Sequence, residues 1–186
     1  MTIDPAAIAR RIKPDKQLAQ LKTRPLDTLV PASAIAGTGR AQLLLDTNVY
    51  IHEAAGTLPA AAQAVLDQCV SFHSSVCIAE LTTGVANGDP AHPRWAAKRD
   101  HYFGLIRTIP EHRLLTPDAE IWAEAGLIAG TLSRVQGFQP HQRKACLNDA
   151  LIYLSAAREG ISVLTANRAE FDLIQQLGGR GNFVYF

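Results

Sequence analysis

Cysteine is scarce in this sequence of 186 residues, and the motifs that use it for metal binding are missing. Cys69, Cys77 and Cys146 are odd in number and form no CxxC pair, so we expect neither a disulfide framework nor a zinc ribbon. The six histidines show no HExxH spacing, which argues against zinc catalysis. No GxGxxG motif or P-loop is present, so no nucleotide cofactor is indicated.

Long apolar runs are also missing. No segment approaches the ~20 apolar residues that a membrane span needs, and the N-terminal residues lack the apolar region of a signal peptide. A hydrophobic content of 47% and a mean hydropathy of +0.02 are typical of a globular domain with a proper core. We therefore expect a cytoplasmic protein without membrane contact.

The net charge is only +1, but it is unevenly distributed. Residues 1–24 carry six basic and two acidic side chains, a net charge of +4, which leaves −3 for the remaining chain. This basic arm could touch phosphates, although a solvated, partly disordered extension is the favoured interpretation. Prolines and glycines mark residues 33–40 as a linker. We therefore divide the chain into an N-terminal extension, 1–40, and a compact domain, 41–186.

The compact domain alternates short apolar strands with helices. The pattern predicts strands near 43–45, 70–73, 113–116, 161–165 and 183–186. It predicts helices near 48–55, 59–69, 76–83, 94–108, 118–135, 144–159 and 169–177. Such alternation is typical of an α/β fold of the Rossmann type, with three layers and a central, mostly parallel sheet flanked by helices.

The first strand of this domain ends in an acid. Leu43, Leu44 and Leu45 are typical of a strand buried on both faces, and Asp46 follows them directly. Ligands of open parallel sheets bind outside the carboxyl ends of the strands, which favours a functional role for Asp46. The alternative is that Asp46 only caps the next helix.

Other polar residues occupy apolar elements in the same way. Glu80 and Asp149 lie in otherwise apolar helices, and Thr165 and Asn167 follow the strand at 161–165. Each has a structural alternative, as an ion-pair partner or a helix cap. A buried acid nevertheless needs a cation, donors or a metal ion. Carboxylates without Cys or His neighbours favour Mg²⁺ or Mn²⁺, which suits metal-assisted phosphodiester hydrolysis.

Four segments in order carry a family resemblance: Leu44–Val49, Ala79–Leu81, Asn148–Ile152 and Val163–Arg168. From Gln42 to the C-terminus the chain resembles PIN-domain ribonucleases, most closely the VapC-type toxins of type II toxin–antitoxin pairs. The resemblance implies an endoribonuclease with Mg²⁺ (or Mn²⁺) held by Asp46, Glu80 and Asp149. It also implies an RNA substrate, a VapB-like antitoxin and a homodimer.

The chain departs from this family pattern at two places. Asn167 stands at a fourth site position where many members have an acid. The missing carboxylate leaves open whether a second metal ion binds. Asp172 is a weaker candidate to replace that acid. Thr165 matches the family threonine that ends the strand, and the resemblance implies that it contributes to substrate binding. About 40 residues precede the first strand, where VapC-type chains have few. They are a mis-assigned start, an arm packed on the domain, or a partner-binding segment.

Two basic residues lie close to the predicted site, and two alternative functions are open. Arg143 and Lys144 precede Asp149 and are expected to contact the substrate backbone. One rival is a catalytically inactive PIN module that binds RNA or a protein. The other is a phosphatase with Asp46 as nucleophile, which would need an acid at position 48, where this chain has Asn48.

Overall fold

The computed structural model describes residues 3–37 and 39–186, and its centre is a six-stranded sheet. All pairings between neighbouring strands are parallel, in the order β1-β6-β5-β2-β3-β4. The strands are β1 Val30–Pro31, β2 Gln42–Leu45, β3 Val70–Ser74, β4 Leu114–Leu115, β5 Ser162–Thr165 and β6 Asn182–Tyr185. The predicted α/β fold with a mostly parallel sheet is confirmed.

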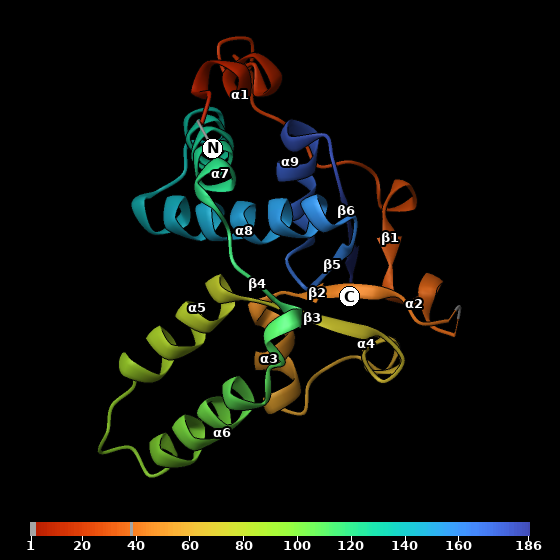
Figure 1. Cartoon of the computed structure of the whole chain (residues 1–186), viewed down its shortest axis with the longest axis vertical. Coiled ribbons are helices and arrows are strands. Elements are labelled where there is room, and N and C mark those ends of the chain that lie inside the picture. The colour runs from red at the N-terminus through yellow and green to blue at the C-terminus, as the bar shows by residue number, and fades with distance from the viewer. Residues whose placement is uncertain (1–2, 38) are drawn as a thin grey trace.

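Helices cover both faces of the sheet, as Figure 1 shows, with α7 and α8 above β2 and β3 in that view and α3, α4 and α6 below them; α9 lies beside β6. The helices of the compact domain are α3 Thr47–Ala54, α4 Ala60–Leu66, α5 Ser75–Ala86, α6 Trp95–Thr108, α7 Ala119–Gln136, α8 Pro140–Glu159 and α9 Arg168–Gly178. This three-layer arrangement buries the sheet, which explains why Leu43–Leu45 of β2 and Val163–Leu164 of β5 are apolar.

The register of the central strands determines which residues share the sheet edge. Leu45 at the end of β2 lies beside Leu164 of β5, and both side chains are buried. The next residues along these two strands are Asp46 and Thr165, so they meet at the carboxyl edge. The apolar residues of β2 and β5 thus fix the position of the two polar ones.

Helix α8 begins earlier than the sequence suggested, at Pro140 instead of residue 144. Proline is well suited to the first helical position. The side chain of Gln142 also accepts a hydrogen bond from the backbone N–H of Gln139, at 2.9 Å, as part of a capping box. Arg143, predicted to precede the helix, therefore lies in its first turn, and Lys144, predicted to begin the helix, lies inside it.

The N-terminal extension packs on the compact domain. Helix α1 Pro5–Ile12 buries Ile8 and Ile12 and lies against α7, at the top of Figure 1. Strand β1 pairs with β6 and extends the sheet, and a short helix, α2 Ala32–Ile35, follows. The expected solvated, partly disordered arm is wrong for these residues. Two isoleucines four positions apart give α1 an apolar face. The prediction rested on the net charge of residues 1–24 and did not consider this face.

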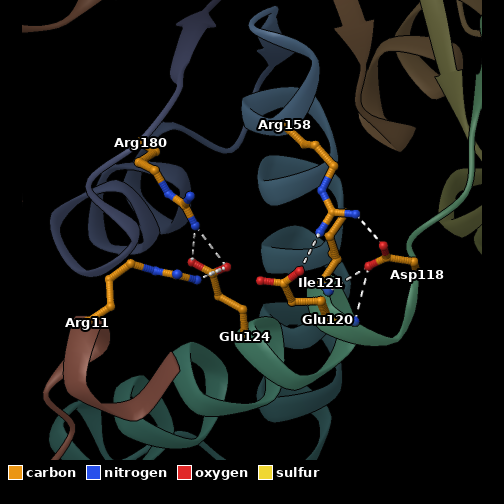
Figure 2. Close-up of polar contacts among 7 residues, drawn as sticks. All are labelled: Arg11, Asp118, Glu120, Ile121, Glu124, Arg158 and Arg180. Atoms are coloured by element: carbon orange, nitrogen blue, oxygen red, sulfur yellow. Dashed lines mark hydrogen bonds and ion pairs between the residues drawn. The ribbon is translucent and has the colours of Figure 1, made fainter. Parts of the chain in front are cut away.

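Ion pairs with α7 hold this arrangement together. Figure 2 shows Arg11 of α1 and Arg180, beyond α9, converging on Glu124, whose exposed fraction is only 3%. Arg180 Nη2 lies 3.1 Å from both carboxylate oxygens of Glu124. In the same figure Arg158 of α8 pairs with Asp118, which caps α7. The extension and the segment that follows α9 are thus tied to the same buried acid.

No helix in residues 3–37 and 39–186 is long and apolar enough to cross a membrane. All three cysteines are free thiols, and Cys77 and Cys146 are buried, as expected from their number and spacing.

Candidate functional site

Asp46 occupies the carboxyl end of β2 and is 3% exposed. Its Oδ1 accepts a hydrogen bond from the backbone N–H of Thr47 at 2.6 Å, so it does cap α3. Its Oδ2 accepts a hydrogen bond from the hydroxyl of Thr165 at 2.6 Å, across from β5. The two interpretations of Asp46, as cap and as site residue, are therefore compatible, because one oxygen caps the helix while the other faces the neighbouring strand.

Asn48 connects the ends of β2 and β5, a role that the sequence did not reveal. Its side-chain amide donates to Asp46 Oδ2 and, at 3.1 Å, to Thr165 Oγ1. Its side-chain oxygen Oδ1 accepts a hydrogen bond from the backbone N–H of Ala166 at 2.9 Å. Asn48 therefore fixes the distance between the two strand ends that carry the site.

Asp149 approaches the same edge from α8 and is 7% exposed. The side-chain amide of Asn167 donates to Asp149 Oδ2 at 2.9 Å and also to Glu170 Oε2 at 2.6 Å. Asn167, predicted as the fourth site residue, thus bridges two carboxylates.

Glu170 is a site neighbour that the sequence-based reasoning missed. It lies in the first turn of α9, three residues after Asn167. An acid one helical turn after a strand-end polar residue was the available signal, because side chains at i and i+3 share a face. Asp172, the substitute considered from the sequence, lies elsewhere: it is fully buried and paired with Arg24 of the extension.

Glu80 reaches the cluster from α5 and is half-buried. One carboxylate oxygen accepts from the hydroxyl of Thr47, the residue that follows Asp46. The other accepts from the side-chain amide of Asn148 at 2.7 Å, next to Asp149 in α8. The alternative of an ion pair between Glu80 and a lysine is not seen among the described residues.

The environment of the cluster raises the pKa of its two most buried acids, Asp46 and Asp149. Burial raises the pKa of Asp46 to about 6, and the charge of Glu80 adds to this, against the hydrogen bonds from Thr165, Thr47 and Asn48. The pKa of Asp149 is raised well above its usual range, first by burial and then by the charge of Asp46. In the described part of the chain no Lys, Arg or His forms an ion pair with these acids. The cluster therefore holds excess negative potential.

The donor set suits a hard cation. Carboxylate and amide oxygens are the ligands that Mg²⁺ and Mn²⁺ prefer, and Mg²⁺ commonly takes only one or two carboxylates from the protein. Within residues 3–37 and 39–186, no three His, Cys, Asp or Glu side chains are already arranged to hold an ion. The chemistry fits such an ion best at Asp46 and Asp149, where the charge is most deeply buried.

The two basic residues predicted to contact substrate face different ways. The guanidinium of Arg143 donates through Nε to the backbone oxygen of Phe138 at 2.9 Å, and its side chain lines a cavity toward α7 with Arg134. Lys144 lines a groove together with Glu80 and Asn148. The structure therefore brings Lys144, but not Arg143, beside the carboxylates.

A comparison of the sequence with family profiles identifies the family of this chain. The profile described as PIN domain matches residues 43–176, which includes all four predicted site positions. The chain belongs to the PIN domain family. PIN domains are generally nucleases, so the carboxylate edge is the place where the family's chemistry is expected. A comparison with curated proteins found no match.

Solved structures share the PIN fold with this chain. FitAcB from Neisseria gonorrhoeae is 22% identical, with a TM-score of 0.54 over 77% of this chain and 96% of that one. FitAB bound to an IR36 DNA fragment is also 22% identical, with a TM-score of 0.52 over 77% and 93%. VapBC-5 from Mycobacterium tuberculosis, a member of the VapBC family of toxin–antitoxin systems, is 21% identical over 78% and 98%, with a TM-score of 0.46.

Proposed function

We propose that this PIN domain is a metal-dependent endoribonuclease that hydrolyses RNA phosphodiester bonds. The observation that carries the proposal is the pair Asp46 and Asp149, which are 3% and 7% exposed and have no cationic partner among the described residues. Burying two charges without a counter-ion costs several kcal/mol each. A divalent cation at this edge would remove that cost.

Asp46, Asp149 and, on the open side, Glu80 would hold Mg²⁺ or Mn²⁺. When bound, such an ion supplies charge stabilisation at the phosphoryl oxygens and makes a neighbouring water more acidic. The protein contributes rigidity. Thr47, Asn48 and Thr165 fix the carboxylate of Asp46 by hydrogen bonds to both of its oxygens.

Glu80 and Asn167 have distinct tasks in this proposal. Glu80 is the least buried of the three predicted acids, and in this proposal it orients the attacking water. Asn167 fixes Asp149 by donating a hydrogen bond to it, and the same amide nitrogen donates to Glu170. Glu170 joins the site as the fourth carboxylate, in place of the acid that Asn167 lacks.

The cellular role that we propose is that of a toxin controlled by an antitoxin. This proposal rests on the order and identity of the four motif segments, which resemble VapC-type toxins. A VapB-like antitoxin would block the carboxylate edge, and the toxin would act as a homodimer in the cytoplasm.

The test is cleavage of a labelled single-stranded RNA by the purified protein with Mn²⁺, with Mg²⁺ and with EDTA. We expect cleavage only with a divalent ion, and its loss in Asp46→Asn and Asp149→Asn, which keep the side-chain shape. Asp27→Asn is the matched control, since Asp27 is exposed and distant in sequence from every site segment. Undiminished cleavage by both site variants would overturn the proposal.

The two rival functions predict other results. A catalytically inactive module would leave RNA intact with every ion. A phosphatase would form an aspartyl phosphate at Asp46, and it would need a second acid at position 48, where this chain has Asn48. Failure to trap a phosphorylated Asp46 would remove this alternative.

A further inference from the structure

A groove of about 590 Å³ opens beside Glu80, and its wall includes Asn148, Lys144, His141 and Trp122. We call it the α5–α8 groove, because most of its wall comes from these two helices. Glu80 and Asn148 are hydrogen-bonded to each other, and the next residue after Asn148 is Asp149. The groove is therefore continuous with the carboxylate cluster. Its size lies within the usual range of ligand pockets, roughly 300–1,000 Å³.

One wall of the groove is a row of polar side chains on α8. His141, Lys144 and Asn148 are spaced by three and four residues, so they lie on one face of the helix. Lys144 and His141 are exposed and have no carboxylate partner in the part of the chain that the structure describes. Lys144, a cation without an ion-pair partner among the described residues, therefore lines the same groove as Glu80.

Trp122, near the start of α7, supplies an aromatic face to the groove. It is 50% exposed, whereas its neighbour Ile121 is 4% exposed. The chain's other tryptophan is used structurally: Trp95 donates through Nε1 to the backbone oxygen of Val85 at 2.9 Å and lies under Arg99. Trp122 has no such contact among the described residues. A large ring exposed beside a free lysine is the combination with which proteins bind unpaired nucleotides.

We infer that the α5–α8 groove seats one unpaired RNA base, stacked on Trp122, while Lys144 contacts the adjoining phosphate. The inference rests on the proposed ribonuclease function and specifies its substrate at one nucleotide next to the cleaved bond. A base can present its face to an indole only when it is unpaired and unstacked. The substrate is therefore single-stranded at this position, and Trp122 is a specificity-determining residue.

The direct test is a double-mutant cycle that combines a Trp122 variant with removal of one RNA base. Binding of a short single-stranded oligoribonucleotide is measured by fluorescence anisotropy in EDTA, with a single abasic position moved along the strand. For the wild-type protein we expect one abasic position to weaken binding about 5- to 150-fold, the range that stacking of one base supports. Trp122→Ala should bind the intact and the abasic RNA alike, whereas Trp122→Phe should keep most of the difference.

The control is Leu26→Ala, because Leu26 is 55% exposed and does not line the groove. It should behave as wild type. The inference is wrong if Trp122→Ala responds to the abasic positions as strongly as wild type does, or if no position matters in the wild-type protein. Loss of a co-purifying antitoxin from Trp122→Ala, with the abasic response unchanged, would overturn it and assign the groove to the protein partner.

The same RNA series with Mn²⁺ separates this inference from the proposed function. Cleavage by the wild-type protein without any dependence on Trp122 would contradict the inference and leave the ribonuclease proposal standing. A Trp122-dependent base response without cleavage under any ion would contradict the ribonuclease proposal and support the groove as an RNA-binding site.

Discussion

Asn167 donates its side-chain amide to Asp149 at 2.9 Å, and the same nitrogen also reaches Glu170 at 2.6 Å. A neutral amide thus lies between two acids, at the position where many relatives are expected to carry a further acid. It reduces the repulsion between the carboxylates in the metal-free protein.

Asn167→Asp should make the protein more dependent on metal. Replacing a donor by a carboxylate removes two hydrogen bonds to acids and adds a like charge, so we expect the metal-free protein to lose about 1–3 kcal/mol of unfolding free energy. Mn²⁺ should then raise the melting temperature more than it does for wild type, because tighter binding gives a larger shift. Asn167→Ala, which removes the donor without adding an acid, is the control. Equal Mn²⁺ shifts in all three proteins would contradict this account.

The stability of the metal-free protein should fall as the pH rises. The pKa of Asp46 is about 6 in the folded state, against 3.8 for the carboxyl group in the unfolded chain, so the folded protein holds a proton that the unfolded chain has released between these pH values. The unfolding free energy therefore decreases through this window, by about 3 kcal/mol for Asp46 alone. Chemical denaturation at pH 4, 5, 6 and 7 measures it. Asp46→Asn should show a smaller decrease, with the remainder coming from Asp149, whose pKa is raised mainly by its own burial; an unchanged slope would refute the assignment.

Asn48→Ala should weaken both the fold and the site. The backbone N–H of Ala166 loses its acceptor and Asp46 loses a donor, which costs about 1–3 kcal/mol for the buried group left unpaired. RNA cleavage should fall more than stability alone explains, since the two strand ends are no longer connected. Asn182→Ala, at an exposed position at the start of β6, serves as control. Wild-type cleavage by Asn48→Ala would show that this connection is not needed.

Arg24→Ala should destabilise the fold, because it leaves the fully buried Asp172 without its ion pair. Removing one partner of a buried pair costs about 3–5 kcal/mol, and the partly exposed Arg24 places the effect near the lower end. Urea denaturation measures this loss. The exposed Arg107, which has no ion pair among the described residues, gives the control Arg107→Ala. If Asp172→Asn restores stability to Arg24→Ala, the unpaired charge is the cause; no loss in Arg24→Ala would contradict the pairing.

Much of the fold could be predicted because strong local patterns coincide with tertiary burial. The leucines of β2 and the apolar run of β5 are buried on both faces, so their sequence alone favours central strands. Strand β1 could not be predicted, since two residues, Val30 and Pro31, carry no period. Its position follows from pairing with β6, which is a tertiary contact.

The candidate site could be predicted in part for the same reason. Asp46 and Asp149 stand out because an acid in an apolar segment is costly. Asn48 and Glu170 do not stand out, because polar residues in the first turn of a helix are common. Arg143 and Lys144 are neighbours in sequence, yet successive residues on a helix point about 100° apart, so only Lys144 faces the groove. Only Arg143 was predicted to lie outside this helix, because the predicted start was residue 144 and α8 begins at Pro140.

The central claim is that the buried carboxylates form a site for a divalent cation, and calorimetric titration with Mn²⁺ tests it most directly. We predict saturable binding to the wild-type protein and to Asp27→Asn, and its loss in Asp149→Asn. Binding should tighten as the pH rises above about 6, because Asp46 must be ionised to act as a ligand. No binding to the wild-type protein, or equal binding to Asp149→Asn, would contradict the claim.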